Sequence, residues 1–253
     1  MIDSSTCLVK PRQVVQVGSP LFGLIAAVFV DRGDEVRQGQ LLAKLDTTVE
    51  EAQVALDRFR ATNTTAMEAA RTDMRWNQRE LARREKLVGN MFSRANEVDE
   101  IVTKIEQDKI AITKAEADQK TALLEAERSE AQLKLKLIKS PLNGVVTDIK
   151  LMPGEFIHDQ ATIMTIAQID PLHIDLVVPA DRYGVVRVGM IADVYLANPV
   201  NFNLPARIDA IDPVIDPASD TFRIRLALPN PGNRIPAGVR CSVRLPDNDD
   251  LVH

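Results

Sequence analysis

Cysteine, histidine and methionine are the residue types of this 253-residue chain that are best suited to redox or metal chemistry. The two cysteines, Cys7 and Cys241, lie near opposite ends of the sequence. In an oxidising compartment one disulfide could join the first strand of a domain to its last. Two separate buried thiols are the alternative, and the sequence leaves both open.

The remaining candidates for metal or catalytic chemistry do not form a recognisable set. The three histidines are far apart in the sequence and neither cysteine is next to one: His158, His173 and His253. A zinc site needs three or four ligands that converge in space, so we expect no metal site. Met67, Met74 and Met91 could bind a soft metal, but methionines on helices usually serve packing. The sequence shows no nucleophile-base-acid set and no phosphate-binding loop, so we expect neither catalysis nor a cofactor.

Charge and hydropathy exclude further classes of function. The 31 basic and 36 acidic residues give a formal charge of −5, spread without a basic face, so we expect no nucleic-acid partner. No apolar run reaches the roughly 20 residues that a membrane-spanning helix needs. The segment from Met1 to Lys10 lacks the basic-then-apolar pattern of a secretory signal, so any such signal is expected to precede this sequence.

An internal repeat organises the first two thirds of the chain. The residues SPLFG at 19–23 correspond without gaps to SPLNG at 140–144, and Gly33-Asp34 then corresponds to Gly154-Glu155. Each copy alternates apolar residues around a glycine-containing turn, which predicts short strands. Because so short a copy cannot bury its own apolar face, we expect both to pack together as one β-sandwich.

The segment between the two copies is predicted to be a helical hairpin. Residues 47–88 contain no proline or glycine, and Thr47 or Thr48 followed by Glu50 and Glu51 can start a helix. Gly89-Asn90 ends the first arm, and each arm of about 40 residues would extend roughly 60 Å. A compact helical bundle is the alternative, but a two-arm segment offers no third helix to cover the charged outer faces.

Apolar residues at heptad-like spacing predict the seam between the two arms. In the first arm the expected seam is Ala52, Leu56, Phe59, Ala66, Ala70, Leu81 and Val88. In the second arm it is Ile101, Ile105, Ile112, Ala115, Ala122, Ala126 and Leu133.

The carboxy-terminal third is predicted to be a small β-barrel or β-sandwich. Apolar residues alternate from Leu172 to Val178 and again from Phe222 to Leu228. Turn clusters such as Asn198-Pro199 and Asp216-Pro217 separate these runs. The strand that contains Cys7 could complete the same sheet.

Three matches make the chain resemble the membrane fusion proteins, or periplasmic adaptor subunits, of tripartite efflux and secretion systems. The first two are lipoyl-type half-motifs, VDRGDEVRQGQLLAKLD at 30–46 and IKSPLNGVV at 138–146. The third is a barrel signature from IDPVID at 211–216 through Thr221-Phe222-Arg223 to Ala237-Gly238. The resemblance covers nearly the whole chain.

This resemblance implies an α+β, elongated, multi-domain protein. It comprises a split lipoyl-like β-sandwich, an inserted antiparallel coiled-coil α-hairpin and a small antiparallel β-barrel. The expected ranges are 1–13 for the first barrel strand, 14–46 and 138–170 for the two sandwich halves, 47–137 for the hairpin with its tip near 89–96, 171–246 for the barrel and 247–253 for a tail.

The resemblance also implies partners and a place in the cell. It implies a periplasmic protein that is associated with the membrane through its partners, an inner-membrane exporter and an outer-membrane channel, and that forms homo-oligomers. The expected exporter is a proton-driven pump of the RND type. In pump-linked family members the hairpin tip that docks the channel carries an arginine, a leucine, a serine and an aspartate. The corresponding residues here are Arg84, Leu87, Ser93 and Asp99, with one extra residue between the serine and the aspartate.

Three other readings remain open from the sequence. An ATP-driven (ABC-type) or type I secretion exporter could replace the RND pump. A biotin- or lipoyl-carrier subunit of an enzyme would need a modified lysine on a tight turn, but the hairpin occupies that place. A free-standing coiled-coil scaffold is the third reading.

Overall fold

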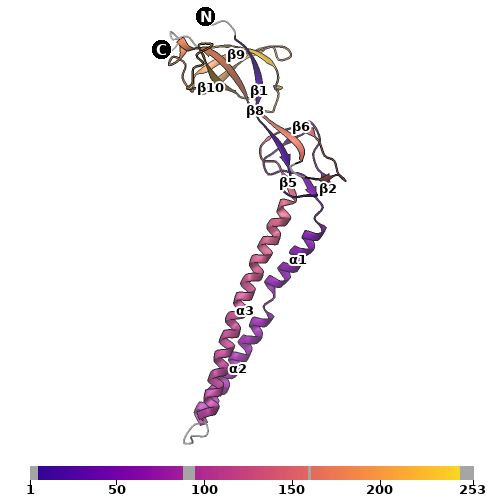
Figure 1. Ribbon diagram of the computed structural model, residues 1–253, viewed down its shortest axis with the longest axis vertical. Coiled ribbons are helices and arrows are strands. Elements are labelled where there is room, and N and C mark those ends of the chain that lie inside the picture. Colours follow the sequence, from indigo (N-terminus) through magenta and orange to yellow (C-terminus); the bar gives the residue numbers. More distant parts are fainter. Residues whose placement is uncertain (1–4, 88–94, 159–160, 246–253) are drawn as a thin grey trace. The chain divides into compact units, whose positions relative to one another are not determined.

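The computed structural model of the chain describes residues 5–87, 95–158 and 161–245. It divides into two compact units, Met1–Leu45 with Ile138–His253, and Asp46–Leu137. The first unit is built from strands and the second from helices (Figure 1).

The strand unit contains a sandwich of two four-stranded layers. The strands are β1 (Ser5–Gly18), β2 (Gly23–Val28), β3 (Glu35–Val36), β4 (Leu41–Leu45), β5 (Leu137–Lys139), β6 (Gly144–Ile149), β7 (Phe156–Ile157) and β8 (Thr162–Pro179). One layer has the order β5-β4-β2-β7, and the other has β1-β8-β6-β3. Apolar side chains from both copies of the repeat form one core, which includes the fully buried Leu42, Leu45, Ile163 and Ile166.

The two copies of the repeat hold each other by reciprocal hydrogen bonds. The Gly33 amide donates to the Val146 carbonyl (2.8 Å), and the equivalent Gly154 amide donates to the Ile25 carbonyl (2.9 Å). Both glycines have a positive φ, 95° and 93°, that other residues rarely adopt. β3 pairs with β6 from the other copy, just as β7 pairs with β2. The two half-motifs therefore fold as one unit, as the repeat predicts.

The second part of this unit is a closed barrel. Its further strands are β9 (Ile191–Leu196), β10 (Phe202–Ile211), β11 (Thr221–Leu228) and β12 (Arg240–Arg244), with a short 3-10 helix at Ala180–Arg182. The order β1-β12-β9-β10-β11-β8 closes because β1 also pairs with β8. The long strands β1 and β8 thus belong to both the barrel and the sandwich.

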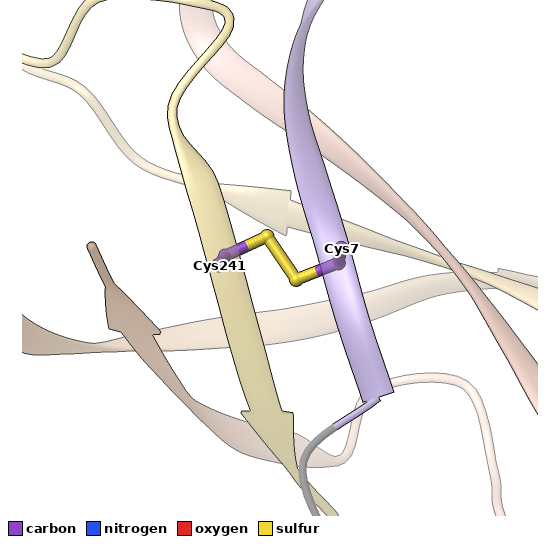
Figure 2. The surroundings of a disulfide bond; sticks show 2 residues. All are labelled: Cys7 and Cys241. Atoms are coloured by element: carbon purple, nitrogen blue, oxygen red, sulfur yellow. A yellow bond between two sulfur atoms is a disulfide. The ribbon is translucent and has the colours of Figure 1, made fainter. Parts of the chain in front are cut away.

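A disulfide joins the first and last strands of the barrel. Cys7 on β1 and Cys241 on β12 are direct partners in the antiparallel ladder, with their Cα atoms 4.8 Å apart, and Figure 2 shows the bond between their sulfur atoms. Both side chains are buried in the barrel core.

The helical unit is an antiparallel hairpin. Its first arm is α1 (Thr48–Thr62) followed by α2 (Thr65–Leu87), and its second arm is the single helix α3 (Ala95–Leu135). The first arm breaks where Asn63 adopts an extended ψ of 105° and its side chain accepts a hydrogen bond from the Thr65 amide. Ion pairs cross between the arms from Glu50–Lys136 to Arg84–Glu97. α3 runs alongside both α1 and α2 (Figure 1).

The expected seam is right for the second arm and wrong for most of the first. All seven expected α3 residues are buried or half-buried. In the first arm only Ala70 and Leu81 are half-buried, whereas Ala52, Leu56, Phe59 and Ala66 are exposed. Val88 lies outside the described residues. The α1 residues that face α3 are Val54, Asp57 and Ala61, so the true seam includes a carboxylate that an apolar pattern cannot detect.

Candidate partner-binding surfaces

The end of α2 and the start of α3 form one end of the hairpin, which we call its distal end. Arg84 lies there. The Arg84 guanidinium donates to Glu80 on its own helix (3.0 Å) and to Glu97 on α3. The hydrogen bond to Glu80, followed by the charge of Glu97, raises the pKa of Arg84. Arg84 thus connects the two arms. Sequence reasoning missed that Arg84 pairs with Glu80 and Glu97, although acidic side chains close to an expected docking arginine were a usable signal.

The other expected docking residues are placed less fully. Leu87 is the last residue of α2. Asp99 is exposed in the first turns of α3, and its main-chain carbonyl accepts a hydrogen bond from Thr103 (2.9 Å). Ser93 lies outside the described residues. The structure therefore brings Arg84 and Asp99 to the same end of the hairpin, close to the end of α2.

A charged cluster lies on the outer side of the barrel, where β1, β8 and β11 are neighbours. Asp175 accepts hydrogen bonds from Arg225 (3.0 Å) and Lys10 (3.4 Å). Burial raises the pKa of Asp175, but these two cations outweigh it and leave the pKa below its usual value. The half-buried His173 has a lowered pKa because of burial, and then because of the charges of Arg225 and Arg12.

The β10–β11 hairpin of the barrel presents two apolar side chains beside a rigid turn. Asp216 accepts hydrogen bonds from the Ala218 amide (2.9 Å) and the Ser219 hydroxyl (3.0 Å), which fix the turn and lower the pKa of Asp216. Val214 is 71% exposed just before this turn, and Ile215 is 38% exposed. An apolar loop on a fixed turn can bind a protein partner.

The described residues contain no metal-type cluster. No group of three or more histidine, cysteine, aspartate or glutamate side chains among them could hold a metal ion. No helix in the described ranges is both long and apolar enough to cross a membrane. Where a lipoyl carrier would present a lysine on a turn, β4 instead continues through Asp46 and Thr47 into α1.

Two family models match the chain in succession. Residues 13–168 match the model described as the CzcB-like barrel-sandwich hybrid domain. Residues 171–249 match the CusB-like beta-barrel domain. The first match alone covers more than half of the chain, including the sandwich and the inserted hairpin.

Curated relatives are distant in sequence. An uncharacterized protein of Haemophilus influenzae is 22% identical over 99% of this chain and 59% of its own length. The pyoverdine export membrane fusion protein PvdR of Pseudomonas putida is 28% identical over 72% of this chain and 48% of its own length. The chain thus spans about half of the length of the curated relatives that it matches.

Solved structures share the fold. MacA from Actinobacillus actinomycetemcomitans superimposes with a TM-score of 0.76 at 21% identity, over 95% of this chain and 76% of that chain. The membrane fusion protein Spr0693 from Streptococcus pneumoniae gives a TM-score of 0.61 at 14% identity, over 96% and 98% of the two chains. The two family matches, together with the two half-motifs that pair with each other on either side of the inserted hairpin, show that the chain belongs to the membrane fusion protein family, the periplasmic adaptor subunits.

Proposed function

We propose that this chain is a periplasmic adaptor that bridges an inner-membrane exporter to an outer-membrane channel. The observation that supports this most strongly is the split sandwich. Its two halves pair with each other through backbone hydrogen bonds and form one domain, and the hairpin is inserted between them in the sequence. In this proposal the distal end of the hairpin contacts the channel, and the barrel contacts the exporter. The chain is membrane-associated through these partners.

The class of exporter is the second part of the proposal. A proton-driven exporter of the RND type is our first candidate, supported by the match of residues 171–249 to the CusB-like barrel model. An ABC-type or type I secretion exporter is the second candidate, because adaptors of these exporters share the sandwich, hairpin and barrel of the family. Purification of the chain after crosslinking in cells, followed by mass spectrometry of the captured transporter, would distinguish the two classes.

The adaptor role requires no chemistry from the chain itself. We propose that it acts without catalysis and without a covalent cofactor, because the hairpin replaces the turn on which a carrier would present its lysine. A mass of the intact protein that shows a lipoyl or biotin adduct, from cells able to attach one, would contradict this part.

A substitution at the distal end of the hairpin tests the channel contact. The variant Leu87→Asp places a charge at the last residue of α2, and the matched control Gln78→Asp places the same charge on an exposed position of the same helix. In a strain that lacks the chain, we expect wild type and Gln78→Asp to restore tolerance to a panel of toxic dyes, metals and siderophore-type chelators. Leu87→Asp should not restore it, although the protein stays folded.

Pyoverdine is a first single cargo to test, because the names of two curated relatives specify its export. Full restoration by a folded Leu87→Asp protein would show that the distal end is not needed for export, and would overturn the proposed channel contact.

In this proposal several copies stand side by side around the export path. Contacts made by one hairpin end are small, and several copies that bind together supply the avidity that one copy lacks.

A further inference from the structure

The two arms of the hairpin have outward faces that point in opposite directions. In each arm the residues that face the other arm recur at alternating steps of three and four, so the opposite side of each helix can be identified. These sides normally carry polar residues, since they are farthest from the seam. Here every residue of both outward faces that the structure describes is exposed, yet their composition is unusual.

The outward face of α1 has no charged residue. Phe59 stands at its centre with 66% of its surface exposed, beside Leu56 at 44% and Val49 at 76%. The face consists of Thr48, Val49, Ala52, Ala55, Leu56, Phe59 and Thr62. An apolar stripe of this kind on a helix that already has a buried face indicates a second packing surface.

The outward face of α3 carries a second apolar stripe. Its residues recur every seven positions, at Ile110, Ala117, Leu124 and Ala131. Ile110 is 69% exposed and Leu124 is 51% exposed, so neither packs inside the hairpin.

The two stripes lie at the same height along the hairpin. Arg58 donates a hydrogen bond to Glu130, and the Ala61 carbonyl accepts one from the Gln119 side chain. Phe59 therefore lies at the same height as the middle of residues 119–130. That middle is the position of Leu124. The steps of seven then place Ala52 level with Ala131, and Ala66 level with Ala117.

Closer to the distal end the two outward faces carry opposite charges. From residue 75 to residue 86, the outward face of α2 bears only cations among its charged residues: Arg75, Arg79, Arg83 and Lys86. The outward face of α3 bears only acids from its start to Ile110: Asp99, Glu100 and Glu106. Because Asn77 bonds to Asp108 and Arg84 to Glu97, these two sets also lie at the same height.

We infer that the outward face of α1 and α2 binds the outward face of α3 on a second copy of this chain, with both copies at the same height. Apolar residues would then meet apolar residues beside Phe59, and arginines would meet acids closer to the distal end. The contact joins two different surfaces, so each added copy leaves one face open for the next, and the array closes only as a ring. This inference rests on the proposed side-by-side assembly and names the residues that would make it.

Covalent trapping in cells tests this pairing. Both native cysteines are disulfide-bonded, so the pair Phe59→Cys and Leu124→Cys adds the only free thiols among the described residues. These two thiols point away from each other within one chain, and can meet only between copies. After mild oxidation of intact cells we expect a ladder of crosslinked oligomers from the double variant and none from either single variant.

The matched control moves one thiol along α3. Ile110→Cys combined with Phe59→Cys offsets the pair by two heptads, about 21 Å, so no ladder is expected. Dimers from the Phe59→Cys single variant would show that two like faces meet, and would overturn the inference. Absence of a ladder from the double variant would also overturn it.

A charge exchange tests the distal half separately. Starting from the Phe59→Cys, Leu124→Cys chain, Arg79→Glu or Glu106→Arg alone should weaken the ladder, and both together should restore it. Failure of the combined exchange to restore the ladder would exclude this charge pairing. A ladder in cells where the chain does not support export would count against the proposed function and leave the inference intact. Export without a ladder would overturn the inference and leave the proposed function intact.

Discussion

Cys7 and Cys241 are separated by 234 positions in the sequence but face each other across β1 and β12. The sequence placed them near the ends of the chain, but only the register of the two strands brings them into contact. A bond between the first and last strands closes nearly the whole chain into one loop, which restricts the unfolded state strongly.

We expect reduction of this bond to destabilise the barrel by about 2–4 kcal/mol. The two tyrosines, Tyr183 and Tyr195, both lie in the barrel region, so tyrosine fluorescence during urea unfolding reports on it. Reductant should therefore lower the urea concentration at the unfolding midpoint of the wild-type protein. A Cys7→Ser, Cys241→Ser variant should unfold at that lower midpoint with or without reductant. A wild-type midpoint that does not respond to reductant would contradict the prediction.

His173 should make the barrel sensitive to acid. Its pKa in the folded protein is lowered, by burial and then by Arg225 and Arg12, so the folded state binds its proton less readily than the unfolded chain does. The stability that the neutral ring contributes is present above the unfolded pKa of about 6.5 and is lost as the pH falls below it. His173→Gln should reduce the loss of stability below that pH, measured by urea unfolding over a range of pH values, and a loss equal to that of wild type would contradict the prediction.

At the scale of elements, the first arm of the hairpin shows where sequence reasoning succeeds and where it does not. Its helical nature follows from residue types alone, but α1 carries two sets of residues at heptad spacing. The more apolar set, with Leu56 and Phe59, is exposed, and the set with Asp57 faces α3. Asp57 can face the seam because both of its oxygens accept hydrogen bonds from Gln53 (3.0 Å), a pairing that hydropathy cannot show.

A second polar contact in the seam can be tested directly. The Asn77 amide donates to the Asp108 carboxylate (2.7 Å) where both side chains are half-buried. Asp108→Leu alone should cost about 1–2 kcal/mol, because it leaves the Asn77 amide without its partner. Combining it with Asn77→Leu should recover most of that loss through apolar packing. Trp76 is the single tryptophan and lies next to Asn77, so its fluorescence during unfolding reports on this part of the hairpin.

At the scale of the whole molecule, the repeat was the most informative part of the sequence. Matching residues 121 positions apart predicted that two distant segments fold together, and the reciprocal bonds of Gly33 and Gly154 confirm it. Alternating apolar residues and turn clusters predicted a small barrel or sandwich in the last third of the chain, and the pairing of β1 with β8 closes it as a barrel. The docking residues could not be predicted as securely, because a binding surface for another protein has no internal packing pattern, and Arg84 proves to connect the arms of its own hairpin.

The central claim is that the hairpin and the barrel of this adaptor contact proteins of two different membranes. The most direct measurement places a photo-crosslinking amino acid at Leu87 in one strain and at Val214 in another, and identifies the captured proteins after membrane separation. The account predicts an outer-membrane channel at Leu87 and an inner-membrane transporter at Val214. Capture of proteins from the same membrane at both positions, or the two partners in exchanged places, would contradict it.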